Sequence, residues 1–158
     1  MVNVRETPVG SFLRVNLGKD GLMLIQVAEV LRDRIGGIVL NKVLVPEHLD
    51  YTVGKIHYFP LKQAEGIDID VFNLLHLGFV TADRKGWQLM YYYGDMKLLY
   101  RYDKAHHRGS FRYMSEYVKT FIRLSCYQIH QLQNIMRYLT DDLEFEYNPE
   151  HSDDETGE

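Results

Sequence analysis

Cysteine is nearly absent from this chain of 158 residues, which contains Cys126 and no other. A single cysteine cannot form an internal disulfide, and the chain has no Asn-x-Ser or Asn-x-Thr acceptor for glycosylation. Disulfides are typical of oxidising compartments, and N-linked glycans are typical of secreted proteins. We therefore expect a reducing setting, in the cytoplasm or the nucleus.

Long apolar runs are also missing. No stretch approaches the roughly 18 residues that a membrane-spanning helix needs. Residues 1–24 contain Glu6, Asp20 and scattered arginines, and they have no continuous apolar core of the kind found in signal peptides. The sequence therefore predicts neither a membrane segment nor a secretory leader.

Motifs that carry known catalytic chemistry are missing as well. The chain has no G-x-S-x-G, P-loop, G-x-G-x-x-G or H-E-x-x-H pattern. His106 and His107 are adjacent, so their side chains diverge, and no cysteine pair accompanies them as in most zinc sites. We expect no metal, no cofactor and no enzymatic activity. A small enzyme of unrecognised class is the third of the functions considered below.

Lysine and arginine do not occur in the last eighteen residues, 141–158, although the chain has a net charge of only −4. The remaining residues, 1–140, carry all 18 Lys and Arg residues against 13 acidic ones. Such a composition predicts a flexible acidic tail behind a basic body. The tail has nine acidic residues: Asp141, Asp142, Glu144, Glu146, Glu150, Asp153, Asp154, Glu155 and Glu158.

Tyrosine and basic residues gather in one stretch, "GWQLMYYYGDMKLLYRYDKAHHRGSFRY" at residues 86–113. It holds six of the twelve tyrosines, the only tryptophan, and five Lys and Arg residues. Between Arg84 and Arg123, nine basic residues face three acidic ones. The basic region of the chain is therefore also its aromatic region.

This coincidence favours a surface for a polyanion, most simply nucleic acid. Single strands bind where a positive groove follows phosphates and aromatic rings stack on bases, at about 1–3 kcal/mol per base. The alternative is that the tyrosines pack inside a sheet while the basic residues keep its outer face soluble. The predicted binding residues are Arg84, Lys85, Trp87, Tyr91, Tyr93, Lys97, Arg101, Lys104, His106, His107, Arg108 and Arg112.

The acidic tail is predicted to compete with the polyanion for this surface, since tethering gives it an effective concentration on the order of millimolar. The layout resembles the acidic C-terminal tails of single-stranded-DNA-binding proteins. The resemblance is one of charge alone and assigns no residue a role. The alternative is that the tail only confers solubility.

The fold class we predict is α+β, with one globular domain over residues 1–140. A β-rich part over residues 9–60 would form a small SH3-like or Tudor-like barrel or a twisted antiparallel sheet. Glycine turns and Pro46 and Pro60 bound its strands, although residues 22–33 would also fit an amphipathic helix. The predicted strands cover residues 9–17, 22–31, 38–45 and 51–59, with Gly54 as a bulge.

Three further elements are predicted after residue 60. A short helix over residues 67–78 has Asp68 or Asp70 at its start and Gly78 at its end. A β-hairpin over residues 87–102 turns at Gly94 and Asp95.

A long amphipathic helix is predicted over residues 110–140, capped by Ser110, because apolar residues recur there every three or four positions from residue 118. Its stripe would form part of the core or the seam of a homodimer. Either this helix or the tail would serve the second function considered, that of a protein–protein adaptor or inhibitor.

Overall fold

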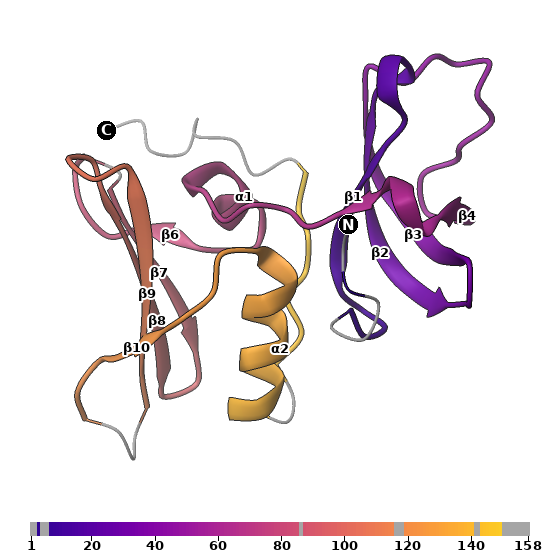
Figure 1. The fold of residues 1–158 in the computed structure, drawn as a ribbon. Coiled ribbons are helices and arrows are strands. Elements are labelled where there is room, and N and C mark those ends of the chain that lie inside the picture. Colours follow the sequence, from indigo (N-terminus) through magenta and orange to yellow (C-terminus); the bar gives the residue numbers. More distant parts are fainter. Residues whose placement is uncertain (1–2, 4–6, 86, 116–118, 141–142, 150–158) are drawn as a thin grey trace. The chain divides into compact units, whose positions relative to one another are not determined.

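A computed structural model describes residue 3 and residues 7–85, 87–115, 119–140 and 143–149 (Figure 1). Internal contacts divide the chain into two compact units, Met1–Asp68 with Gln128–Leu139, and Ile69–Tyr127 with Thr140–Glu158. In the described part of the chain antiparallel sheets dominate and two α-helices occur, which is consistent with a small α+β fold. The single domain expected over residues 1–140 would include both units and stays a prediction.

The first unit is built on a five-stranded antiparallel sheet in the order β4-β3-β2-β1-β5, which curls into a half-barrel (Figure 1). Strands occur in all four ranges predicted for this region, with shifted ends. The alternative helix over residues 22–33 is wrong, because that segment pairs along β1 and β3. The strands are β1 Phe12–Asn16, β2 Leu22–Val30, β3 Arg34–Val43, β4 Ile56–Pro60 and β5 Ala64–Glu65.

Alternating side chains on these strands form the core of the first unit. The turn at Gly18–Asp20 is a 3-10 turn, as its glycines suggest. Gly54, with φ of +84°, lies in the turn before β4 and is not a bulge within the strand, so this detail was wrong. Irregular pairing occurs in β2 instead. The core consists of Leu13, Val15, Met23, Ile25, Val27, Ile35, Val39, Phe59 and Ala64.

Helix α2, Ile129–Leu139, belongs to the same unit and packs on β1. The buried Gln133 side chain joins helix to strand, because its Oε1 accepts from the Phe12 amide at 2.8 Å and its Nε2 donates to the Gly10 carbonyl at 3.0 Å. One side of the helix, at Ile129, Leu132 and Met136, is buried.

No helix in the described part of the chain is long and apolar enough to cross a membrane.

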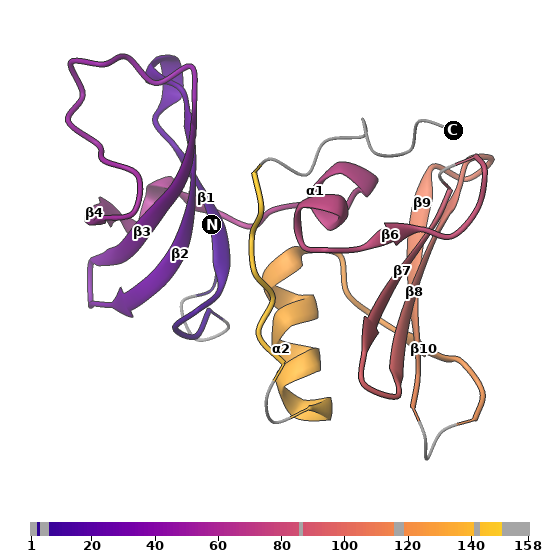
Figure 2. The ribbon, with the colours of Figure 1, turned by 180° about the vertical axis from the view of Figure 1, so that it is seen from behind.

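The second unit contains a sheet in the order β10-β9-β8-β7-β6 and helix α1, Val71–His76 (Figure 2). The predicted hairpin is confirmed, with Gly94 at φ of +54° in its turn. The predicted short helix is also present but shorter, and the Asp70 Oδ1 atom accepts from the Asn73 amide at 2.7 Å as its cap. The strands are β6 Val80–Thr81, β7 Gln88–Tyr93, β8 Met96–Asp103, β9 Arg108–Met114 and β10 Ile122–Leu124.

The long helix predicted over residues 110–140 is wrong over most of its length. Residues 108–114 and 122–124 are strands, and the helix begins only at Ile129. Ser110 is not a helix cap but pairs with Arg101 across β9 and β8. Pairing with β8 outweighs the local helical spacing, because strand formation depends on a partner that a linear pattern does not reveal. The continuous seam that suggested a homodimer is therefore not formed.

The flexible tail predicted over residues 141–158 is wrong for residues 143–149, which pack on the second unit. Leu143 and Phe145 are buried, and the Phe145 ring lies 5.0 Å from that of Tyr91. The Asn148 amide donates to the His76 carbonyl at 2.8 Å, and the Asn148 carbonyl lies 2.9 Å from His76 Nδ1. Residues 141–142 and 150–158 of the predicted tail lie outside the described residues.

Candidate anion-binding site

The sheet of the second unit has one apolar face. Leu89, Tyr100 and Phe111 stand opposite one another on β7, β8 and β9, and all three are buried. Burial raises the pKa of Tyr100 to about 12 and also raises the pKa of Tyr91. Tyr100 and Phe111 of the predicted binding stretch are therefore part of a core, and Tyr91 is partly buried there, where burial disfavours the ionised form of a hydroxyl.

The other face of the same sheet carries arginines. Arg101 on β8 stands opposite Ser110, and Arg112 on β9 stands opposite Arg123 on β10. Alternation along β9 brings Ser110 and Arg112 to the same side, so the three arginines share a face. All three are exposed, and among the described residues none of them forms an ion pair.

These arginines border a depression with a volume of about 650 Å³. Arg108 and Lys104 also line it, so five cationic side chains meet two carboxylates there, those of Asp83 and Asp103. The excess of positive charge favours an anionic ligand. The complete lining is Asp83, Trp87, Gln88, Arg101, Tyr102, Asp103, Lys104, Ala105, Arg108, Gly109, Ser110, Arg112 and Arg123.

Trp87 and Tyr102 also line the depression, where β7 begins and β8 ends, and their stacked rings are called the aromatic wall below. Strand alternation places them on the side of Leu89 and Tyr100 rather than on that of Arg101. The Trp87 and Tyr102 ring centroids lie 5.6 Å apart with an angle of 23° between the planes. The Lys104 ammonium lies 5.3 Å from the centre of the Trp87 ring, within cation–π range. The Asp83 Oδ1 atom accepts from the amides of Lys85 and Trp87, each at 3.1 Å, and so fixes the turn that leads into β7.

A tight loop between β8 and β9 forms another part of the rim. The Asp103 carboxylate accepts from the Ala105 amide at 3.0 Å and lies 2.6 Å from His106 Nδ1. The hydrogen bond with the His106 side chain lowers the pKa of Asp103. Asp103 is thus engaged within its own loop, although Arg108 stands directly opposite it on β9. Arg108 remains available to a ligand.

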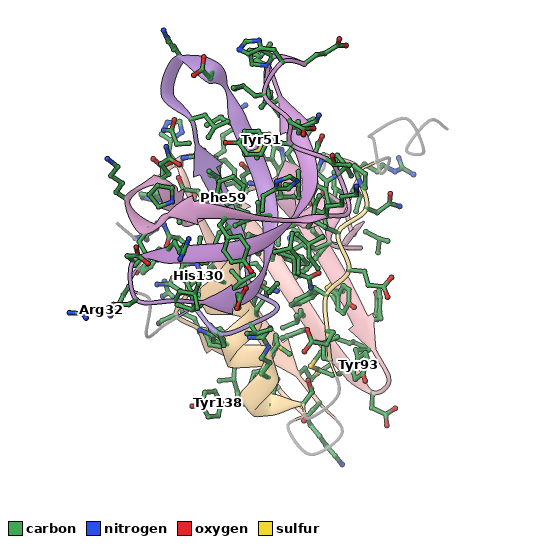
Figure 3. The ribbon with its side chains drawn as sticks, turned by 90° about the vertical axis from the view of Figure 1, so that its right-hand side faces the viewer. Arg32, Tyr51, Phe59, Tyr93, His130 and Tyr138 are labelled. Carbon is green, nitrogen blue, oxygen red and sulfur yellow. The ribbon has the colours of Figure 1, made fainter. Side chains whose placement is uncertain are left out.

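The structure brings five of the twelve predicted binding residues together around the depression: Trp87, Arg101, Lys104, Arg108 and Arg112. Tyr91 packs against Phe79 and Phe145 in the apolar face instead. The remaining predicted residues do not line the depression. Tyr93 lies at the turn end of the hairpin (Figure 3), and the others are Arg84, Lys85, Lys97, His106 and His107.

Eight lining residues were not among the predicted binding residues, and four of these could donate to an anion or stack on a base: Arg123, Gln88, Ser110 and Tyr102. Arg123 and Ser110 were placed in the supposed long helix, where they would not face Arg101. Gln88 and Ser110 stand opposite Arg101 on the two neighbouring strands. They could therefore have been identified only once the pairing of β7, β8 and β9 was known. The signal for Tyr102 was its position across the hairpin from Trp87.

Among the described residues, no group of three or more His, Cys, Asp or Glu side chains could hold a metal ion. Burial raises the pKa of the Cys126 thiol to about 12, so the reactive thiolate is scarce at neutral pH.

No protein-family model matches the chain, and no curated protein or solved structure matches it either.

Proposed function

We propose that this protein is a non-enzymatic binding protein for a polyanion, most simply single-stranded nucleic acid. The observation that carries the proposal is the depression on the arginine face, where five cationic side chains meet two carboxylates. Guanidinium groups match phosphate oxygens with paired hydrogen bonds. Arg101, Arg112 and Arg123 have no ion-pair partner among the described residues, so a ligand phosphate would not have to displace one.

Single-stranded nucleic acid fits better than a simple polyanion because an aromatic wall adjoins the arginines. The Trp87 and Tyr102 stack offers a flat face to a base, and stacking contributes about 1–3 kcal/mol per base. In a duplex, the bases are already stacked on each other. The wall therefore supports a ligand whose bases are unstacked.

The acidic end of the chain acts as an intramolecular competitor in this proposal. Leu143 and Phe145 anchor the preceding segment on the second unit, so we assign the competing carboxylates to residues 150–158. Those nine residues hold five acidic side chains and span at most about 30 Å when extended. A tether of that length keeps the carboxylates at high effective concentration.

Fluorescence anisotropy of labelled single-stranded oligonucleotides tests the proposal. The full chain and a chain that ends at Pro149 are compared at two salt concentrations. Ending at Pro149 removes the competitor and leaves the anchoring contacts of Phe145 and Asn148 in place. We expect salt-dependent binding that tightens when the chain is shortened. Absence of binding by both chains, or a dissociation constant independent of salt, would refute the proposal.

Binding to a protein, as an adaptor or inhibitor, is the second candidate. The acidic residues of 150–158 favour it, as do two largely exposed tyrosines, Tyr127 at 80% and Tyr138 at 92% relative exposure. Figure 3 labels Tyr138 on helix α2. It predicts salt-sensitive binding to a cationic polypeptide such as polylysine, lost in the chain that ends at Pro149. Affinity for polylysine without affinity for oligonucleotides would favour this candidate. Homodimerisation stays a prediction.

Two finer proposals concern the fold and the compartment. The number and antiparallel order of strands β1 to β5, together with their curl, support an SH3-like or Tudor-like barrel. A free Cys126 supports a reducing compartment, the cytoplasm or the nucleus.

A further inference from the structure

Three arginines from three adjacent strands converge in the depression. Arg112 and Arg123 are a directly opposed cross-strand pair, and Arg101 is the diagonal neighbour of Arg112, two residues along the β8–β9 ladder. Directly opposed residues have Cα atoms about 4.5–5.5 Å apart, and diagonal neighbours are about 7–8 Å apart. The three side chains can therefore reach a single small anion from different sides.

The opposed pair is unfavourable without an anion. Like charges directly opposite each other destabilise a sheet, and β10 is an edge strand of only three residues, Ile122–Leu124. An anion held between Arg112 and Arg123 would replace this repulsion with two charge-assisted hydrogen-bonding contacts. The repulsion thus marks the position at which a ligand would bring the largest gain.

Neutral hydrogen-bonding groups lie beside this position. Gln88 and Ser110 both stand opposite Arg101, on β7 and β9, and both line the depression. An amide and a hydroxyl can donate to phosphate oxygens that the guanidinium groups leave uncovered. The cluster therefore offers donors on several sides of one anion.

Other basic side chains of the region lie outside the depression, although strand alternation puts Lys97 on the same face as Arg101. Arg84, Lys85 and Lys97 do not line the depression. Its volume of about 650 Å³ lies within the range of small-ligand pockets, roughly 300–1,000 Å³. A nucleic-acid strand that is bound along its length needs cations spread along a groove. Here they are concentrated at one place.

We propose that the depression binds the terminal phosphate of a nucleic-acid strand, with the terminal base against Trp87 and Tyr102. This inference rests on the proposed function. A terminal phosphate monoester carries a charge of about −1.5 to −2 at pH 7, whereas an internal phosphodiester carries a single charge. Three convergent guanidinium groups match the larger charge, and a small depression admits an end more readily than the middle of a strand.

The test compares three unlabelled single-stranded oligonucleotides of one sequence, with a 5′-phosphate, with a 3′-phosphate, and with neither. Each competes with one labelled oligonucleotide for the full chain, at constant salt, in an anisotropy assay. We expect one of the two phosphorylated ends to increase affinity about tenfold, as a charge-assisted contact worth about 1.4 kcal/mol would. Which end does so identifies the source of the phosphate.

Variants locate the effect. Arg112→Gln and Arg123→Gln should each abolish the preference for the phosphorylated end. Arg84→Gln removes the same charge outside the depression and should retain it. Thermal unfolding of each variant shows that it is folded, so loss of preference cannot be mistaken for loss of structure.

Two outcomes overturn the inference in different ways. If all three oligonucleotides bind equally well and Arg112→Gln weakens each of them equally, internal phosphates occupy the site. The proposed function then stands and the terminal-phosphate inference is wrong. If none of the three binds, both are wrong.

Discussion

The two faces of the sheet β10-β9-β8-β7-β6 derive from the same strands and differ in what they hold. One face buries Leu89, Tyr100 and Phe111. The other exposes Arg101, Arg112 and Arg123 around a depression. Because successive side chains of a β-strand point to opposite faces, tyrosines and arginines that alternate along the sequence lie on different faces of the sheet. Mixing tyrosine and arginine in one segment therefore does not mean that both serve a ligand.

The apolar face also explains the C-terminal segment. Leu143 and Phe145 alternate with exposed Glu144 and Glu146, so the acidic residues point outward while the apolar ones complete the core. The segment is extended and covers the Tyr91 and Phe79 rings. An acidic composition alone suggested a mobile tail, but two apolar residues at the right spacing are enough to fix it.

The largest effect is expected from Phe145→Ala, which tests whether the C-terminal segment is part of the apolar face. Phe145 is 3% exposed and its ring contacts those of Tyr91 and Phe79. Removing a buried phenylalanine side chain should lower the free energy of unfolding by about 3–5 kcal/mol. Chemical denaturation measures it. The exposed neighbour Glu146→Ala should change it by about 0.5 kcal/mol or less; equal effects of both variants would show that the segment is not anchored.

Gly109→Ala should produce the next largest effect. A Cβ atom at residue 109 would lie 2.3 Å from the Tyr100 ring, so the buried ring or the strand must shift. Such overpacking destabilises by about 1–3 kcal/mol. A double-mutant cycle with Tyr100→Leu, measured by thermal unfolding, isolates the contact. If the penalty is the same in both backgrounds, the Tyr100 ring does not rest on Gly109.

Binding should separate the aromatic residues that line the depression from those that pack in the core of the second unit. Trp87→Ala removes the stacking wall and should weaken oligonucleotide binding by about 1–3 kcal/mol. Tyr91→Phe changes only a hydroxyl in the apolar face and should leave affinity unchanged. Because Trp87 is the only tryptophan, its fluorescence in the unmodified chain should also change on titration with oligonucleotide. Equal losses in the two variants would mean that the rings lining the depression have no special role in binding.

The smallest effect concerns alkaline pH. Burial raises the pKa of Tyr100 from 10.0 to about 12, so its neutral form is favoured in the folded state. The stabilisation from this shift is complete below pH 10 and is lost as pH rises from 10 to about 12. Unfolding curves at several pH values should show this decline, and Tyr100→Phe should show a shallower one. An identical decline in both chains would contradict burial of the Tyr100 hydroxyl.

Much of the local structure could be predicted from the sequence. The glycine turn at Gly94, the cap at Asp70 and the strands of the first unit all have short-range signals. The prediction of a helix over residues 110–140 was wrong although apolar residues do recur there at spacings of four and three. Strand β9 pairs with β8, and no local pattern in the sequence identifies that partner. Pairing register is a long-range property, and a one-residue change of register exchanges the two faces.

The candidate site was predicted only in part for the same reason. Arg101, Arg108 and Arg112 were identified from charge clustering, and the structure places them together. Tyr91 was assigned to the site because tyrosines and basic residues cluster in residues 86–113, yet Phe145, more than fifty residues later, packs against its ring. Arg123 was missed because it joins the cluster through the pairing of β10 with β9.

The most direct test of the central claim compares two charge-matched double variants. Arg112→Gln with Arg123→Gln removes two positive charges from the depression, whereas Lys55→Gln with Lys62→Gln removes two exposed charges from the first unit. Binding of a labelled single strand is measured across a salt series. We predict that the first variant loses at least about tenfold in affinity and that its salt slope falls by about 1.4, while the second changes little. Equal losses in the two variants would show that net charge alone drives binding, and the arginine face would not be the site.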